Sequence, residues 1–482
     1  MPEWQPDAEN PFPKRMNVKD ESLIAPRVTP VLDPNFRPAA LANRDFRARV
    51  KASGRAQPVR LALEQADRSV FHCATEVFEE SDAHAAGNFV HVMRLVKFLL
   101  WGWGGWRIHV DGPPSLAAKL QTYFRETTTG KFDSNIIGEK IYDHAIEVVA
   151  ARELPAARSA TRPLGRHLNG CRIGFDLGGS DRKVAAVIDG KVVFSEETVW
   201  DPYFHPDPQY HFDGIMDSLK KAAAHLPRVD AIGGSAAGCY VDNRVKAASL
   251  FRGVAPDLFE ARVKNLFFEV QRAMDGVPIE VVNDGEVTAL AGSMSLGQNA
   301  VLGLALGTSL AAGYVTRDGN ITSWLNELAF APVDDNPAAP RDEWSGDYGV
   351  GAQYFSQQAV GRLIAPAGIE VEPQLPLPEK LKHVQALMAQ ADERARKIYQ
   401  TVGTYLGYAI AHYAEFYDFD HVLILGRVTS GTGGDVIVEG AKEVLQIEFP
   451  GLAERVGFHV PDEKDKRHGQ AVAAASLPIV KG

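Results

Sequence analysis

The sequence predicts an α/β protein whose later part forms two similar lobes, preceded by a separate N-terminal α+β module. Three observations support this fold class. At 482 residues the chain is too long for one ordinary core. Strand-like and helix-like patterns alternate after a stretch of linker composition, and a short glycine motif occurs twice at the same distance from a second turn.

The N-terminal part has its own sequence of elements. Residues 1–57 are rich in Pro, Arg and Ala, and we expect an irregular arm with a short helix over Pro38–Lys51. Hydrophobic spacing then predicts strands and helices in mixed order, which defines an α+β module over residues 58–165. The expected strands are Val59–Leu63, Val70–Val77 and Trp106–Val110, and the expected helices are Ala85–Leu100 and Ser115–Phe124.

The stretch ARELPAARSATRPLGRHLNG over residues 151–170 has linker composition and is the best domain boundary. After it we expect strands at Arg172–Asp176, Val184–Ile188, Val192–Ser195, Asp230–Gly233 and Pro278–Val282, and helices at Asp213–His225 and Ala261–Met274. The pair Asp189-Gly190 predicts a type I′ hairpin turn between the second and third of these strands.

The chain then repeats itself. Leu177-Gly178-Gly179-Ser180 is followed by Asp189-Gly190, and Leu306-Gly307-Thr308-Ser309 is followed by Asp318-Gly319. The spacing from Leu to Asp is the same in both copies, and each copy begins on a strand-like run. This pattern predicts an internal duplication, and therefore two similar lobes with a cleft between them.

Two glycine turns, one in each lobe, are suited to holding a polyphosphate, because backbone N–H groups can approach an anion where no β-carbon intervenes. Asp176 directly precedes the first turn motif, and a carboxylate beside phosphate favours an intervening Mg²⁺. A second acid, Asp284, stands where a predicted strand ends and a helix begins, a usual place for active sites. From the residues alone, Asp284 is equally well explained as the N-cap of that helix.

These segments resemble the ROK proteins (repressors, open reading frames and sugar kinases) of the hexokinase, Hsp70 and actin superfamily. The resemblance covers about Cys171 to Val480 and rests on five segments in family order. They are GFDLGGSDRKVAAVIDG, VVNDGEVTALAG, LALGTSLAAGYV, NELAFAPVD and VLILGRVTSG. The resemblance implies a two-lobed actin/hexokinase-like (ribonuclease H-like) fold, with lobe I over 166–290, lobe II over 291–467, and a C-terminal helix over 468–482 packing back on lobe I.

The resemblance also implies an ATP-dependent kinase that transfers the γ-phosphate to a hydroxyl of a sugar, amino sugar or polyol such as a cyclitol. Asp284 would be the general base, and Asn283, Glu327, Ser235 and Arg252 would bind the substrate. Asp176 would contact Mg²⁺ and belong to the ATP site. The other residues of the ATP site would be Gly178, Gly179, Ser180, Lys183, Gly307, Thr308, Ser309 and Gly426. A homodimer is expected as well.

The departures from the family pattern concern a zinc module. Phe330 stands at the position of a family histidine, and Ser345 and Val350 fall where thiolates would be. Cysteine is absent between residues 240 and 482, so we expect no zinc. Phe330 also replaces a sugar-contacting residue, which leaves the identity of the sugar open.

Composition and charge indicate which kind of partner and which cellular location to expect. The 51 basic and 61 acidic residues give a net charge of −10, which disfavours a nucleic-acid binder. Cys73, Cys171 and Cys239 are far apart, the N-terminus lacks the apolar region of a signal peptide, and no apolar run is long enough to span a membrane. We therefore expect a cytoplasmic protein whose partner is a small molecule, not a membrane or nucleic acid.

Two alternatives to the kinase remain. A catalytically silent sugar-binding sensor or scaffold would explain the altered sugar contacts, although it would not need Asp176, Asn283, Asp284 and both glycine turns. A transcriptional regulator is disfavoured because the N-terminal module begins with strands and shows no compact three-helix pattern. The segment Trp101–Trp106 (WGWGGW) is explained either by buried packing or by an interface or lid.

Overall fold

A computed structural model describes residues 24–159, 164–460 and 463–480. The first 23 residues of the expected arm, part of the expected linker and the last two residues therefore lie outside the description. The chain divides into two compact units, each assembled from separate segments. The first unit contains Met1–Ala160, Glu327–Tyr413 and Gly431–Pro450, and the second contains Thr161–Asn326, Ala414–Ser430 and Gly451–Gly482.

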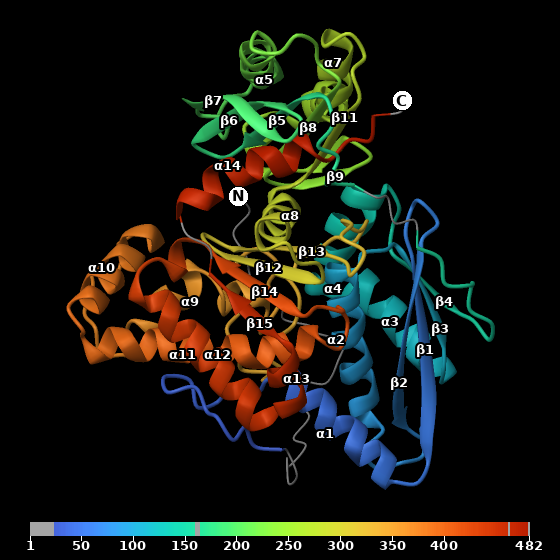
Figure 1. The fold of residues 1–482 in the computed structure, drawn as a ribbon. Helices are drawn as coiled ribbons and strands as arrows, with labels where there is room; N and C mark the ends of the chain where they lie inside the picture. The colour runs from blue at the N-terminus through green and yellow to red at the C-terminus, as the bar shows by residue number, and fades with distance from the viewer. Residues whose placement is uncertain (1–23, 160–163, 461–462, 481–482) are drawn as a thin grey trace. The chain divides into compact units, whose positions relative to one another are not determined.

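The first unit contains the predicted α+β module, built on a four-stranded sheet in the order β2-β1-β3-β4 (Figure 1). Its strands are antiparallel except for the pair β3 and β4, and α1 packs against β2 while α3 packs against β4. The module's elements are α1 (Ala39–Ala52), β1 (Ala56–Glu64), β2 (Val70–Phe78), α2 (Ala86–Gly102), β3 (Arg107–Asp111), α3 (Pro114–Glu126), α4 (Thr128–Asp133), the π-helical η1 (Ser134–Ile141) and β4 (Glu147–Ala150).

Four helices from later in the sequence complete the first unit. They are α9 (Gln357–Leu363), α10 (Leu377–Ala389), α11 (Glu393–Tyr413) and α12 (Thr432–Glu448), together with the 3₁₀ turn η4 (Gly351–Gln353). The helices α11 and α12 pack side by side along their lengths. Two glycines, Gly403 and Gly440, face each other at this contact and allow the backbones to approach closely. The sequence patterns did not predict that these helices join the N-terminal module.

The second unit contains two sheets with related topology. The first sheet has the order β11-β8-β5-β6-β7, and the second has the order β13-β12-β14-β15. In each, a central strand pairs antiparallel with the next strand in sequence and parallel with a later one. This repeated pattern confirms the predicted duplication and the two-lobed α/β fold class.

The bounds of the elements in the second unit follow the predicted strands closely. They are β5 (Cys171–Leu177), β6 (Asp181–Ile188), β7 (Lys191–Val199), α5 (Pro208–Ala223), β8 (Ala231–Ala236), β9 (Cys239–Val241), β10 (Arg244–Ala247), η2 (Ser249–Phe251), α6 (Pro256–Leu258), η3 (Phe259–Val263), α7 (Leu266–Ala273), β11 (Ile279–Asn283), α8 (Asp284–Leu296), β12 (Val301–Leu306), β13 (Leu310–Val315), β14 (His421–Leu425), η5 (Arg427–Thr429), β15 (Gly457–His459) and α14 (Glu463–Ala475). The helix α13 (Pro450–Arg455) begins at the last residue of the first unit.

Two predicted elements differ in the structure. The helix predicted over Ala261–Met274 is broken into η3 and α7 at Lys264-Asn265. The two aspartate–glycine turns also differ from each other. Asp189 and Gly190 both have positive φ, as a type I′ turn requires, and they alone separate the paired residues Ile188 and Lys191. The second turn is one residue longer, because the Thr316 N–H donates to Asn320 O and the Gly319 N–H donates to Thr316 O.

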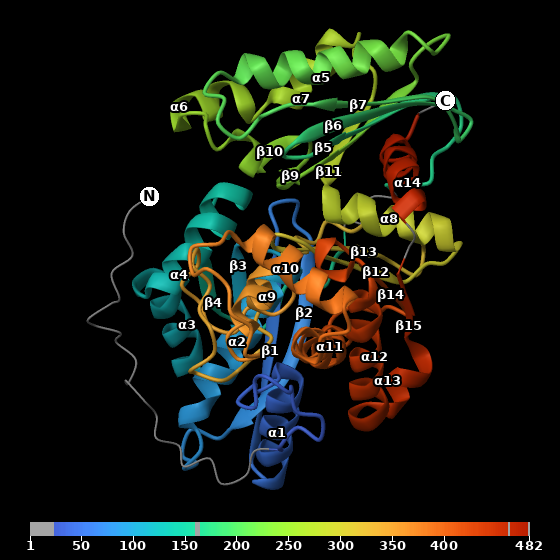
Figure 2. The ribbon, with the colours of Figure 1, turned by 90° about the vertical axis from the view of Figure 1, so that its left-hand side faces the viewer.

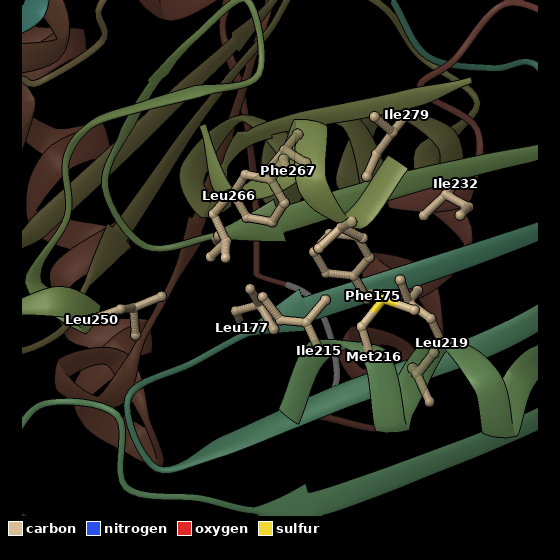
Figure 3. Close-up of a cluster of buried hydrophobic side chains, with 14 of the residues drawn as sticks. Phe175, Leu177, Ile215, Met216, Leu219, Ile232, Leu250, Leu266, Phe267 and Ile279 are labelled. Atoms are coloured by element: carbon tan, nitrogen blue, oxygen red, sulfur yellow. The ribbon is translucent and has the colours of Figure 1, made fainter. Parts of the chain in front are cut away.

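The first sheet is buried on both faces. Side chains of β5 pack with those of α5 and α7 in the hydrophobic core drawn in Figure 3. On the opposite face lies α14, which contacts β5 and β8 (Figures 1 and 2). The paired residues Gly174 and Gly233 make room for it, since a β-carbon on Gly174 would lie 1.9 Å from the carbonyl oxygen of Ala471. Residues near the end of the chain thus support the strand that carries Asp176.

The buried side chain of Arg172 anchors this C-terminal segment. It donates to the carbonyl oxygens of Pro478 (2.8 Å) and Ala475 (3.3 Å) and is fully inaccessible to solvent. Replacing it by Met leaves these carbonyls without their charged donor. We expect Arg172→Met to lower the free energy of unfolding by about 2–3 kcal/mol, measured by urea denaturation.

The matched control is Arg228→Met, because Arg228 is an exposed arginine of the same unit with only Asp230 as an ion-pair partner. Its loss is expected to change the free energy of unfolding much less than Arg172→Met does, because the Arg228 ion pair is exposed to solvent. Equal effects of the two substitutions would contradict the anchoring role of Arg172.

Candidate active site

Asp284 lies at the junction of a strand and a helix. The strand β11 ends at Asn283, and Asp284 is the first residue of α8. The N-cap is Asn283, whose Oδ1 accepts from the Gly285 N–H (2.7 Å) while its Nδ2 donates to Gly238 O (2.8 Å). The capping role that the sequence allowed for Asp284 therefore belongs to Asn283, and Asp284 is available for other chemistry.

The carboxyl group of Asp284 is electrostatically perturbed. Burial and, to a smaller extent, the neighbouring charge of Asp176 together raise its pKa from 3.8 to about 6, against a weaker opposing effect of the Gly285 N–H. The residue is nevertheless only partly buried as a whole. A carboxylate with its pKa near neutrality at a strand end is suited to accept a proton.

Asp176 is held by the two strands that flank β5. Ser235 on β8 donates its hydroxyl to Asp176 Oδ1 (2.6 Å), and Lys183 on β6 lies 3.7 Å from Oδ2. Burial raises the pKa of Asp176, although Ser235 and Lys183 oppose this effect. Lys183 also pairs with Asp181 at 2.7 Å. Ser235, which was predicted to bind the substrate, is fully inaccessible to solvent. In the structure its hydroxyl is bonded to Asp176.

The first glycine turn follows β5 and is closed by one hydrogen bond, from the Gly178 N–H to Asp181 O (2.9 Å). Trp200 fixes the turn from outside by donating its indole N–H to Gly178 O (2.8 Å). Within the described part of the chain, the amides of Gly179 and Ser180 have no hydrogen-bond acceptor. Two backbone donors of this turn are thus available to an anion.

The second glycine turn follows β12 and repeats this arrangement. The Gly307 N–H donates to Ser309 O (2.9 Å), and the amides of Thr308 and Ser309 have no acceptor among the residues that the structure describes. Gly426 lies against the start of this turn at the end of β14. Its φ is +105°, and a β-carbon there would lie 2.4 Å from the carbonyl oxygen of Leu306. Both the conformation and the close approach require glycine at this position.

Contacts within the second unit bring these parts together. Asp176 is close enough to Asp284 to raise its pKa. The next residue, Gly285, packs on β13, where a β-carbon would lie 2.4 Å from the carbonyl oxygen of Ala312. Ala312 is three residues beyond Ser309 of the second turn. The two carboxylates and the two glycine turns therefore belong to one region of this unit.

Two further predicted site residues, Arg252 and Glu327, have contacts of their own. Arg252 stacks on the ring of Tyr203 (4.0 Å from its guanidinium carbon to the ring centroid) and lies beside Phe204. Tyr203 in turn adjoins the first turn, because a β-carbon on Gly179 would lie 1.9 Å from its hydroxyl. Glu327 belongs to the first unit, where its backbone N–H donates to Trp101 O.

Sequence reasoning missed two tyrosines of this region. Tyr240, on β9, donates its hydroxyl to Ala237 O, and burial together with the charge of Asp284 raises its pKa well above the ordinary value. Tyr203 covers Gly179, as described above. Neither tyrosine stands in a motif. Tyr203 lies in the aromatic segment Trp200–Phe212, and Tyr240 lies two residues after the glycine-rich segment Gly234–Gly238.

The residues fit ATP and Mg²⁺. Four unpaired backbone donors in two turns suit phosphate oxygens. Mg²⁺ is commonly held by one or two carboxylates together with substrate phosphates and water, so Asp176 suffices as a protein ligand. Among the described residues there is no group of three or more His, Cys, Asp and Glu side chains placed to hold a metal by themselves.

No family model and no curated protein matches the sequence. Among solved structures, the chain is similar to a ROK hexokinase from Thermus thermophilus (17% identity over 63% of this chain and 97% of that chain, TM-score 0.49). It is also similar to a ROK family glucokinase from Streptomyces griseus in complex with glucose and AMPPNP (20%, 64% and 98%, TM-score 0.46). A third similar structure is a ROK family transcriptional regulator, homologous to the E. coli MLC protein (18%, 64% and 79%, TM-score 0.48).

These solved structures carry the name of the family that the sequence motifs resemble. Kinases and a regulator both occur among them, and TM-scores below 0.5 at such low identity do not decide an activity. None of the helices that the structure describes has the length and apolarity needed to cross a membrane.

The raised pKa of Asp284 predicts a measurable cost to stability. Because the folded state binds the proton more tightly than the unfolded chain, the wild-type protein loses stability as the pH rises from about 4 to about 6. Asp284→Asn removes the charge. We expect a gain of about 1–2 kcal/mol in the free energy of unfolding at pH 7.5, a range reduced for the partial exposure of the group.

The gain should shrink below pH 6 and disappear near pH 4, where Asp284 is itself protonated. Urea denaturation at several pH values measures it. A gain that does not change with pH would show that ionisation of Asp284 is not what destabilises the folded protein.

Proposed function

We propose that the chain is an ATP-dependent kinase that transfers the γ-phosphate to a hydroxyl of a sugar, amino sugar or polyol. The observation that carries the proposal is a partly buried Asp284 with a pKa of about 6, beside Asp176 and two turns with free backbone donors. A proton acceptor next to an anion cradle is what phosphoryl transfer to an alcohol requires.

Asp284 serves as the general base in this mechanism. The substrate hydroxyl gives its proton to the Asp284 carboxylate while its oxygen bonds to the γ-phosphorus. The bond from that phosphorus to the bridging oxygen breaks, and ADP leaves. The capping hydrogen bonds of Asn283 fix the backbone at Asp284, so the carboxylate keeps its direction at the start of α8.

The two turns orient the nucleotide. Amides of Gly179, Ser180, Thr308 and Ser309 donate to phosphate oxygens, and Gly426 lines the adenosine side. Asp176, held by Ser235 and Lys183, contacts Mg²⁺ or its water. When bound, Mg²⁺ supplies neutralisation of the charge that develops on the phosphates.

On the substrate side, we assign the hydrogen bonds with the acceptor's hydroxyls to Asn283 and Glu327. Arg252 would contact a phosphate or carboxylate of the acceptor. A homodimer and a cytoplasmic location stay predictions from the family resemblance. The first is measured by light scattering of the purified protein.

A silent sugar sensor is the second candidate, and one observation favours it. Phe330 packs its ring against Trp101 (4.6 Å between centroids) at the position where the family has a sugar-contacting histidine. Tight binding of a sugar without turnover, and without any dependence on Asp284, would support the sensor. Retention on DNA at physiological salt would instead support a regulator.

The proposed chemistry is tested by ADP release with Mg-ATP across a panel of sugars, amino sugars and cyclitols. We expect turnover with at least one acceptor. Asp284→Asn should reduce kcat by a factor of about 10²–10⁴, the usual contribution of a general base. Intact activity in this variant would contradict the assignment of the base.

The pH dependence of the same reaction follows from the raised pKa. Asp284 accepts a proton only when ionised, so kcat/KM should be constant above pH 7 and fall as the pH drops through about 6. Initial rates at saturating Mg-ATP between pH 4.5 and 8 measure this. A midpoint near 4 would mean that the reacting carboxylate is not perturbed.

A further inference from the structure

The N-terminal module contacts the segment that contains Glu327. Within the first unit, the Glu327 N–H donates to the carbonyl oxygen of Trp101 (2.9 Å), in the last turn of α2. The Trp101 side chain is almost fully buried, donates its indole N–H to Asp133 Oδ1 (3.1 Å) and packs on Phe330. The predicted substrate glutamate is thus bonded through its backbone to a residue of the WGWGGW motif.

A buried ion cluster makes a second connection. Lys97, on α2, lies 2.5 Å from Asp133 of the same module and 3.0 Å from Asp347 of the later segment. All three side chains are nine-tenths or more buried. Burial alone would raise the pKa of Asp347, but the charges of Lys97 and Arg94 outweigh it and hold the pKa below its ordinary value. Removing one member would leave an uncompensated buried charge, so the contact is strongly specified.

Arg94 makes a third connection, also from α2. Its guanidinium pairs with Asp335 (3.0 Å), donates to the backbone oxygens of Asp334 (2.7 Å) and Tyr348 (3.1 Å), and stacks on the Tyr348 ring. Arg94, Lys97 and Trp101 are spaced three and four residues apart, so they lie on one face of the helix. This face of α2 therefore contacts the later segment at three places along that segment, at Glu327, Asp335 and Asp347.

The later segment is irregular, and turns and single hydrogen bonds, such as that from the Val333 N–H to Gly349 O, hold it internally. Between the end of β13 at Val315 and the 3₁₀ turn at Gly351, the chain contains no helix or strand, only isolated bridges such as Pro332 with Val350. An irregular backbone of this length needs outside contacts to hold one conformation. Residues 37–39 supply some of them, since the Ala39 N–H donates to Val333 O and Arg37 O accepts from the Asp335 N–H. The contacts of Arg94, Lys97 and Trp101 all come from α2.

We propose that α2 of the N-terminal module is the positioning element for Glu327, through Arg94, Lys97 and Trp101. This inference rests on the proposed function and deepens it, because it makes the module part of the acceptor side of the kinase. The residues assigned to ATP all lie in the second unit, whereas Glu327 and α2 lie in the first. Loss of the α2 contacts therefore weakens binding of the acceptor and not of the nucleotide.

Trp101→Leu in the full chain tests this role through the split between two Michaelis constants. We expect the KM for the acceptor to rise about tenfold or more and the KM for ATP to stay within about twofold. Trp101→Phe keeps an aromatic ring against Phe330 and should restore most of the loss. Equal increases in both KM values, or no increase for the acceptor, would overturn the proposal.

Arg60→Met is the matched control, because Arg60 is an exposed cation of the same module that pairs with Asp111 on the sheet. It should leave both KM values unchanged. Asp347→Asn covers the case in which Trp101→Leu does not fold, since it keeps the shape of the segment and removes only one charge. The same one-sided rise in the acceptor KM is expected, and an unchanged acceptor KM would count against the proposal.

Hydrogen exchange supplies a readout that does not need catalysis. In Asp347→Asn, amides of residues 327–350 should exchange about tenfold faster than in the wild type, while those of β5 and β6 stay unchanged. Unchanged exchange in 327–350 would overturn the positioning role. If the wild-type protein phosphorylates no acceptor, the proposed function fails, and the exchange result still decides whether α2 holds the segment.

Discussion

The close packing of the start of α8 on β13 is the constraint on which the candidate site depends. Gly285 and Gly313 meet there without side chains, so the first turn of α8 touches the second sheet directly after leaving the first. A side chain at either glycine would collide with the facing backbone, because a β-carbon at Gly285 would lie 2.4 Å from Ala312 O and one at Gly313 would lie 2.2 Å from Gly285 O. Asp284 is fixed by this contact on one side and by the end of β11 on the other, which places it beside both glycine turns.

The two units balance buried charge in opposite ways. In the second unit, the charge of Asp176 adds to the effect of burial and raises the pKa of Asp284, which is useful where a proton must be accepted. In the first unit, every aspartate of the buried cluster has a cation beside it: Lys97 lies next to Asp133 and Asp347, and Arg94 pairs with Asp335. Two neighbouring carboxylates that perturb a pKa are typical of a reacting site, whereas carboxylates that each contact a cation are typical of a structural contact.

The sequence predicted local features well and long-range ones poorly. Strand β5, the hairpin at Asp189-Gly190 and the place of Asp284 follow from nearby residues, because hydrophobic alternation and turn chemistry are local. The pairing of Arg94 with Asp335 left no such signal, since 241 residues separate them. The buried partner of Ser235 was missed for a related reason: its register beside Asp176 is decided by sheet order, not by its own neighbours.

The division of the chain into interleaved units has a consequence for synthesis. Arg94 and Lys97 leave the ribosome about 240–250 residues before their partners Asp335 and Asp347, which at ordinary translation rates is about 12–50 s. During that time two cations on an apolar helix have no later segment to cover them. The face of α2 that Asp335 and Asp347 cover in the finished protein therefore stays uncovered until the later segment has been synthesised.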